Sequence, residues 1–254
     1  MIYFISDAHL GSRAIPHQRT QERRLVRFLD QIKDKAEAVY MLGDIFDFWF
    51  EYDDVVPRGY TRLLGKISEL TDSGVDVHFF VGNHDMWMGD YLSRECGVTI
   101  HHESCLVEIH GKEFYLAHGH DQDIDPDDWK TRLMFRIFES KTCLKFAKMI
   151  HPHPFINFGL NWAKRNREKH DTEGEPTFLG EKDERLVVFA KQYLADHPGV
   201  NYFIFGHRHF ELDMMLSHEC RMMIIGEWFK KFTFVTFDGE NLKMDNYIEG
   251  ETAL

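Results

Sequence analysis

The chain has 254 residues, of which 43% are hydrophobic and 28% are charged, and its formal net charge is −12. This composition is ordinary for a soluble globular protein, and a chain of this length can bury a substantial core. The acidic balance argues against general nucleic-acid binding, so we expect no nucleic-acid partner.

The N-terminal third alternates between short apolar runs and segments with helical spacing. The predicted elements are a strand at 2–6, a helix at 19–33, a strand at 38–42, a helix at 61–70 and a strand at 75–81. This order predicts a sheet with crossover helices on its face.

After about residue 97 the predicted strands become shorter. They lie at 106–109, 113–117, 202–205, 212–216, 222–225, 232–237 and 242–248, with a helix at about 184–195. The first two surround His110-Gly111 and are predicted to form a hairpin. We therefore predict an α/β fold of the four-layer α+β kind, in which a two-sheet β-sandwich is flanked by helices.

The segment 129–169 differs from the rest in charge and in apolar content. It holds ten Lys or Arg and two acids, so it carries +8 and the remainder of the chain carries −20. The pairs Leu133/Ile137 and Met134/Phe138 have i,i+4 spacing, which makes two faces of one helix apolar. The segment is either a helical hairpin packed on the core with solvated lysines, or a surface that contacts lipid or a membrane.

Five short segments place His, Asp or Asn directly after an apolar run. They are Asp7-Ala8-His9, Gly43-Asp44, Gly82-Asn83-His84-Asp85, His118-Gly119-His120 and Gly206-His207-Arg208-His209. Functional groups gather at the carboxyl ends of strands in open α/β sheets, so we expect these side chains to meet. Each segment alone has an ordinary explanation, such as a surface loop or a helix cap, but five in order indicate a site.

The residue types in these segments indicate the kind of ion they bind. Carboxylate, imidazole and amide oxygen without thiolate favour Mn²⁺, Fe²⁺ or Zn²⁺. Seven candidate ligands exceed what one tetrahedral ion uses. Two divalent ions that share one bridging carboxylate fit them, as in two-metal sites for displacement at phosphorus.

The order D-x-H, G-D-x-x-D, G-N-H-D, H-G and G-H-x-H across residues 7–209 resembles the signature of the calcineurin-like metallophosphoesterases. The resemblance implies one metal held by Asp7, His9, Asp44 and His209, and a second held by Asp44, Asn83, His118 and His207. In that scheme Asp44 bridges, His84 contacts phosphate and assists the leaving group, and Asp85 orients His84. A bridging water made acidic by the two metals attacks phosphorus in line.

Within this family the chain looks most like the UDP-2,3-diacylglucosamine diphosphatases of lipid A synthesis. The similarity lies in the N-terminal segment through Leu10 and in the Gly-Asp segment with its following aromatics. It implies a single domain, residues 1–254, with a helical cap inserted at 127–170, and a substrate split into UMP and 2,3-diacylglucosamine 1-phosphate. The expected substrate contacts are Asn83, His84 and His207 from the motifs, together with Asp128, Arg165 and Lys169, which are chosen only by their location in the cap segment. The best-studied branch carries Arg at the position of His84 and Asp at that of His120.

Two alternatives remain beside this function. One is a phosphodiesterase or phosphatase of the same fold with a soluble substrate such as a nucleotide, and the other is a non-enzymatic scaffold. We also expect Asp47 to support the site without binding metal. Phe48, Trp49 and Phe50 are expected to form a wall of a lipid-facing groove, with a buried aromatic cluster under the cap as the alternative.

The cellular location is predicted from three features of the sequence. The N-terminus lacks a basic region and a long apolar run, and no stretch approaches about 18 uninterrupted apolar residues. The four cysteines show no C-x-x-C spacing, which indicates free thiols in a reducing compartment. We expect a cytoplasmic protein that contacts the inner face of the membrane through its basic segment.

Overall fold

The structure is a computed structural model that describes residues 1–174 and 176–248, with the side chains of residues 169–173 outside that description. Its strands are β1 (Ile2–Ile5), β2 (Ala38–Leu42), β3 (Asp76–Phe80), β4 (Thr99–His101), β5 (Cys105–Ile109), β6 (Lys112–Ala117), β7 (Val200–Phe205), β8 (Leu212–Met215), β9 (Arg221–Ile224), β10 (Thr233–Phe237) and β11 (Leu242–Asn246). Its helices are α1 (Gln18–Ile32), α2 (Thr61–Asp72), α3 (Tyr91–Cys96), α4 (Trp129–Glu139), α5 (Lys141–Ala147), α6 (Pro152–Glu173) and α7 (Arg185–Asp196).

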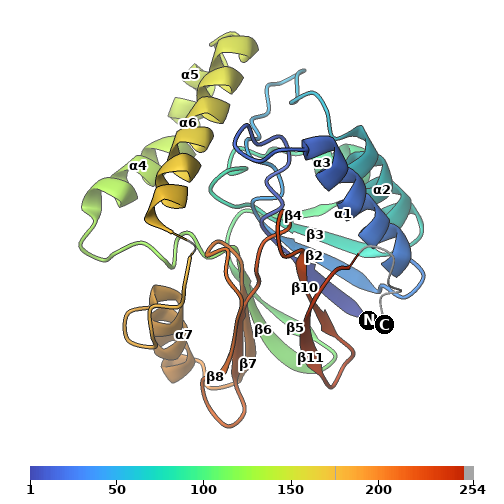
Figure 1. The fold of residues 1–254 in the computed structure, drawn as a ribbon, viewed down its shortest axis with the longest axis vertical. Helices are drawn as coiled ribbons and strands as arrows, with labels where there is room; N and C mark the ends of the chain where they lie inside the picture. Colours follow the sequence, from blue (N-terminus) through green and yellow to red (C-terminus); the bar gives the residue numbers. More distant parts are fainter. Residues whose placement is uncertain (175, 249–254) are drawn as a thin grey trace.

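The strands form two sheets that face each other (Figure 1). The first has the order β11-β10-β1-β2-β3-β4, and β1 to β4 run parallel within it. The second has the order β5-β6-β7-β9-β8, with β6, β7 and β9 parallel. The predicted 106–109/113–117 hairpin is confirmed by the antiparallel pair β5–β6.

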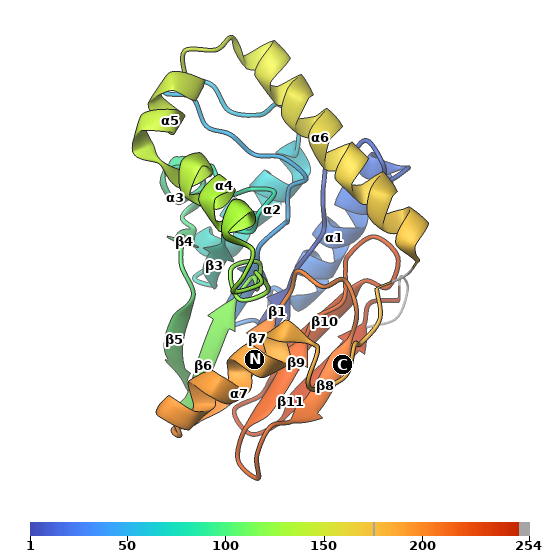
Figure 2. The same cartoon turned by 90° about the vertical axis from the view of Figure 1, so that its left-hand side faces the viewer.

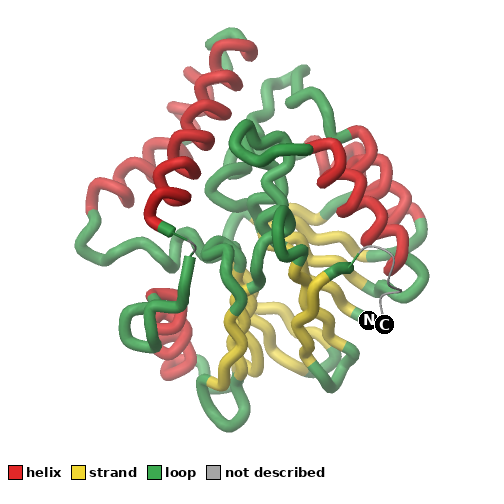
Figure 3. Tube along the Cα trace, in the orientation of Figure 1, coloured by secondary structure: helices red, strands yellow, loops and turns green. Residues whose placement is uncertain are grey.

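Three apolar cores hold four layers together. Side chains on opposite faces of β1 show why its run is wholly apolar: Phe4 packs between the two sheets, whereas Tyr3 packs toward the helices on the outer face of the first sheet. The helix-side core contains Phe28 from α1, Leu63 from α2 and Leu92 from α3. A third core joins the second sheet to α7. The predicted four-layer sandwich flanked by helices is confirmed, and Figure 3 shows the helix and strand layers.

The main elements missing from the sequence-based prediction are α3 and β4. The helix α3 has six residues and β4 has three, so neither is long enough to show a clear hydrophobic period. Both lie at one edge of the first sheet, where β4 pairs in parallel with β3.

The helices α4, α5 and α6, here called the cap helices, stand apart from the sandwich beyond one end of the sheets (Figures 1 and 2). Trp87 links α4 to the rest of the protein, because its Nε1–H donates a hydrogen bond to the carbonyl of Phe138 at 3.0 Å. Large apolar side chains that remain exposed on this segment are Trp129, Leu133, Ile137, Phe146, Met149, Ile150 and Phe158. No helix in the described part of the chain is long and apolar enough to cross a bilayer.

The aromatic stretch after Asp44 is buried, so the prediction that it forms a lipid-facing wall is wrong. Phe48, Trp49 and Phe50 are each at most 5% exposed. Trp49 packs in the helix-side core, and the rings of Phe48 and Phe50 lie 6.1 and 4.7 Å from that of Phe155 in α6. The stretch therefore forms part of the surface on which the cap helix α6 packs.

Candidate metal centre

The five predicted segments meet because parallel strands deliver them to the same edge of the two sheets. Asp7 follows β1 and Asp44 follows β2, and the Asp7 N–H donates to the carbonyl of Gly43 at 3.1 Å. In the second sheet, His118 follows β6 and accepts at its carbonyl from the Gly206 N–H at 2.9 Å. These backbone hydrogen bonds join the Asp7 segment to the Asp44 segment and the His118 segment to the Gly206 segment.

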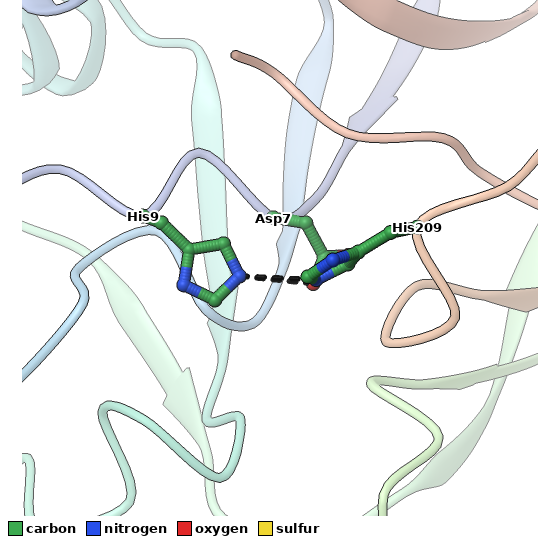
Figure 4. A group of neighbouring side chains, drawn as sticks. All are labelled: Asp7, His9 and His209. Atoms are coloured by element: carbon green, nitrogen blue, oxygen red, sulfur yellow. Dashed lines mark hydrogen bonds and ion pairs between the residues drawn. The ribbon is translucent and has the colours of Figure 1, made fainter. Parts of the chain in front are cut away.

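The first group of candidate ligands consists of Asp7, His9 and His209. Figure 4 shows the imidazoles of His9 and His209 directed toward each other beside Asp7. Their Nε2 atoms lie 3.1 Å apart, and the Asp7 Oδ1 lies 3.0 Å from His209 Nε2 and 3.6 Å from His9 Nε2. Three ligand atoms from the two sheets therefore converge on one point.

Asp44 lies at the centre of the arrangement. Its Oδ2 atom is 3.4 Å from His118 Nε2 and 3.7 Å from His9 Nε2. It belongs to two further groups of neighbouring ligand atoms, one with His9 and His84 and the other with Asp7 and His118. A carboxylate shared between groups is the arrangement that a bridging ligand requires.

Two buried polar atoms at the site are suited to bind cations. Asn83 Oδ1 and His118 Nε2 are buried and have no hydrogen-bond partner in the described part of the chain. The Nδ1 atom of His118 lies 2.7 Å from the carbonyl of Leu42, which fixes a proton on Nδ1 and makes Nε2 the nitrogen that binds a cation once its own proton is lost. Buried polar atoms without partners are costly unless a ligand satisfies them, so the residues present fit divalent cations.

The backbone at the site is held in a conformation that most residues avoid. Five of the seven predicted ligands have positive φ: Asp7, His9, Asp44, His207 and His209, with values between 45° and 67°. The glycines allow close packing there, because a Cβ on Gly82 would lie 2.2 Å from the Oδ1 atom of Asp44. Such backbone strain concentrates at functional sites.

His84 is oriented by a different group from the one predicted. The Nδ1 atom of its ring lies 3.0 Å from the backbone carbonyl of Asp47. Its backbone N–H donates to Asp44 Oδ1 at 2.9 Å. Asp85 instead accepts from the backbone N–H groups of Gly82, at 2.7 Å, and Phe46. The prediction that Asp85 orients His84 is therefore corrected: Asp85 holds the loops, and Asp47 holds His84.

The carboxylate of Asp47 supports the site from behind, as expected. Its Oδ1 atom approaches His9 Nδ1 at 3.2 Å, and this contact directs His9 Nε2 toward the cluster. His120, whose role was open, is buried with its ring 5.6 Å from Phe135 of α4, so it lies between the centre and a cap helix.

The structure does not bring every predicted substrate contact to the centre. Asp128 is the N-cap of α4, and its carboxylate accepts from the N–H and hydroxyl of Thr131. Arg165 is exposed on α6, and the side chain of Lys169 lies outside the described residues. His207 does lie at the centre, with its ring 5.2 Å from that of His118.

The protonation of the cluster follows from its packing. Burial by itself would lower the pKa of His118, but the carboxylates of Asp44 and Asp7 and the carbonyl of Leu42 together outweigh burial and raise this pKa to about 10. Burial would raise the pKa values of Asp7 and Asp44, yet the surrounding imidazoles hold both well below their usual range. Burial and the charge of Asp44 together raise the pKa of Asp85 to about 7.

Cation binding is expected to release protons. Because the pKa of His118 is about 10 without metal, its imidazole carries a proton at neutral pH that a metal at Nε2 must displace. The apparent affinity for Mn²⁺ should weaken as the pH falls. Calorimetric titration at pH 7.5 in two buffers with different ionisation enthalpies should show about one proton released from His118 when the cations bind. Equal heats in both buffers would contradict this assignment.

A comparison with protein families agrees with the geometry. The family model described as "Calcineurin-like phosphoesterase" matches residues 1–211. The chain belongs to the calcineurin-like phosphoesterase family. It is a metal-dependent phosphoesterase, and its buried His/Asp groups are candidate metal ligands.

Curated relatives of this phosphoesterase match over nearly its whole length. The UDP-2,3-diacylglucosamine hydrolase of Porphyromonas gingivalis is 41% identical, and the match covers 96% of this chain and 97% of that protein. The protein of the same name from Vibrio vulnificus strain CMCP6 is 35% identical over 94% of this chain and 96% of that protein. That from Aeromonas hydrophila is 27% identical over 90% of each.

The sequence reasoning missed one residue of the phosphoesterase site. Arg167 of α6 is only 11% exposed, and its Nη2 atom lies 3.7 Å from the Oδ1 atom of Asp47. Its guanidinium lies over the ring of Phe229 at 5.0 Å, and its buried Nε has no hydrogen-bond partner among the described residues. Arg167 was one of ten basic residues in its segment, and no local signal marked it as the buried one.

Proposed function

We propose that this phosphoesterase hydrolyses the diphosphate bond of UDP-2,3-diacylglucosamine and releases UMP and 2,3-diacylglucosamine 1-phosphate. The observation that carries the proposal is the 41% identity to the UDP-2,3-diacylglucosamine hydrolase of Porphyromonas gingivalis. That alignment covers 96% of the chain, so it must include the cap helices. An alignment restricted to the family motifs would not include them.

We assign two divalent cations to the centre. Asp7, His9, Asp44 and His209 would hold one, and Asp44, Asn83, His118 and His207 would hold the other. Two cations in such a site polarise phosphoryl oxygens and lower the pKa of water. Mn²⁺ is our choice, with Fe²⁺ and Zn²⁺ as alternatives, because the donor set contains no thiolate.

Two side chains in the proposed scheme act on the phosphates directly. The Nδ1–H of His84 faces the carbonyl of Asp47 at 3.0 Å, which leaves Nε2 available to the reacting phosphate. Arg167 brings a positive charge from α6 to within 3.7 Å of the carboxylate of Asp47, the residue whose backbone carbonyl faces His84, and we assign this charge to the substrate phosphates. A planar guanidinium suits two phosphate oxygens at once.

The proposed role of residues 127–170 is to cover the acyl chains and to rest on an anionic membrane. A groove of about 230 Å³ runs along α4, lined by Trp129, Lys130, Leu133, Met134, Ile137 and Phe138. Further exposed apolar side chains include Met149 at 78% and Phe158 at 68%. Apolar side chains mixed with lysines and arginines are suited to an interface with anionic lipids.

The activity is tested by incubating the purified chain with Mn²⁺ and UDP-2,3-diacylglucosamine. The expected result is UMP together with the lipid monophosphate. If bis(p-nitrophenyl) phosphate is hydrolysed but no UMP appears with Mn²⁺, Fe²⁺ or Zn²⁺, the substrate is a different phosphoester. If neither is hydrolysed and no metal binds, the enzymatic assignment fails.

Membrane contact should depend on cap lysines. Each of Lys130, Lys141 and Lys145 is exposed, and each is expected to contribute about 1 kcal/mol of attraction to an anionic bilayer. Changing all three to Gln should lower the partition coefficient onto phosphatidylglycerol liposomes, measured by flotation, by up to about a hundredfold. The matched control changes three exposed lysines outside the cap to Gln: Lys112, Lys182 and Lys243. Equal flotation of both triple variants would refute docking by the cap.

A further inference from the structure

The turn that follows β6 lies against one of the proposed ligands. It carries Asp123, whose N–H donates to the carbonyl of Gly119 at 3.0 Å. The Oδ2 atom of Asp123 lies 3.4 Å from Nε2 of His207, and the Asp123 side chain is 18% exposed. Asp123 is not one of the predicted ligands, so its contact with His207 comes from outside the proposed ligand set.

This contact is held by a set of charged side chains that spans three segments. Arg208, which lies between His207 and His209, places Nη1 3.6 Å from Asp123 Oδ2 and donates from Nε to Glu184 at 3.0 Å. Glu184 is fully buried. From the start of α7, Arg185 donates to the backbone carbonyl of Asp123 at 2.9 Å. Asp123 is thus held through both its side-chain carboxylate and its backbone carbonyl.

The position of Asp123 determines which nitrogen of His207 can bind a cation. A neutral imidazole carries one proton, and a carboxylate beside Nε2 stabilises the form with the proton on Nε2. The lone pair is then on Nδ1. His118 has the opposite arrangement, because the carbonyl of Leu42 lies 2.7 Å from its Nδ1. The two histidines therefore present different nitrogens.

We propose that Asp123 is a positioning residue that holds His207 in its Nε2–H form, so that Nδ1 is the atom it offers to the second cation. The inference rests on the proposed assignment of His207 as a ligand. Carboxylates that orient a ligating histidine typically affect metal affinity by about 10- to 100-fold.

The test compares the full-length chain with Asp123→Ala and Asp123→Asn by Mn²⁺ titration. Asp123→Ala is expected to weaken one of the two Mn²⁺ sites by about 10- to 100-fold and to leave the other unchanged. Asp123→Asn should restore part of the loss, since its amide oxygen still accepts from Nε2–H. The matched control is Asp125→Ala, which removes an ion pair with Arg185 from the same turn and should leave both sites unchanged.

A second measurement excludes a merely structural role. Long-range ¹H–¹⁵N spectra of the chelated full-length chain should show the Nε2–H form of His207 in the wild type and a shift toward Nδ1–H in Asp123→Ala. An unchanged His207 spectrum, or equal weakening of both Mn²⁺ sites, would overturn the role of Asp123. These readouts need no substrate, so they remain decisive if the lipid substrate is wrong. A wild-type chain that binds no Mn²⁺ would overturn the inference and the proposed metal centre together.

Discussion

Replacing Asp44 with alanine is expected to remove bound metal and phosphoesterase activity together. Asp44 Oδ2 lies within 3.7 Å of nitrogen atoms from both His9 and His118, so its loss removes a ligand atom common to both proposed cations. Metal ions contribute several kcal/mol to stabilising charge on a phosphoryl group, so kcat should fall at least about a thousandfold. The measurements are metal content by mass spectrometry and the rate of UMP release.

The matched control for this variant is Asp54→Ala in the same loop region. Asp54 is exposed, so its removal should change both metal content and rate by less than about threefold. Full metal content with normal turnover in Asp44→Ala would refute the bridging role. Because Asp44 also accepts from the N–H of His84, the melting temperature of the variant should be compared with that of the wild type to detect local unfolding.

Replacing Arg167 with alanine should lower kcat/KM for the diphosphate substrate by about 10- to 100-fold. A hydrogen bond to a charged group contributes about 1.5–3 kcal/mol, and each 1.4 kcal/mol is a tenfold change in rate. The kcat/KM of Arg167→Lys should lie between those of the wild type and Arg167→Ala, because lysine keeps the charge but loses the planar pair of donors. The measurement is the rate of UMP release over a range of substrate concentrations.

Arg165→Ala provides the control for Arg167 because it removes the same side chain two positions earlier on α6. Two residues correspond to a rotation of about 200°, so Arg165 lies on nearly the opposite face of the helix. Its removal should change kcat/KM by less than about threefold. Wild-type kcat/KM in Arg167→Ala would exclude a phosphate contact. If only Mn²⁺ affinity fell, Arg167 would act through Asp47, which it approaches at 3.7 Å.

The sequence determined where the strands end and which polar residues follow them. Apolar runs such as the one before Asp7 are buried on both faces, so they are visible without any knowledge of their partners. Parallel strands have their carboxyl ends at one edge, which is why Asp7, Asp44, Asn83 and His84 could be grouped in advance. The short elements α3 and β4 were not predicted, because a six-residue helix and a three-residue strand show almost no hydrophobic periodicity.

The tertiary structure alone decided which polar atoms face each other. Asp128 satisfies the N-terminus of its own helix, whereas Arg167, far along the chain from Asp47, is buried beside it. Likewise, the nitrogen that each histidine presents is set by contacts such as that of Asp123 with His207. Spacing along the chain reports the direction of a side chain relative to its own helix or strand. Contacts between distant segments depend on how those elements pack, and local spacing contains no record of that packing.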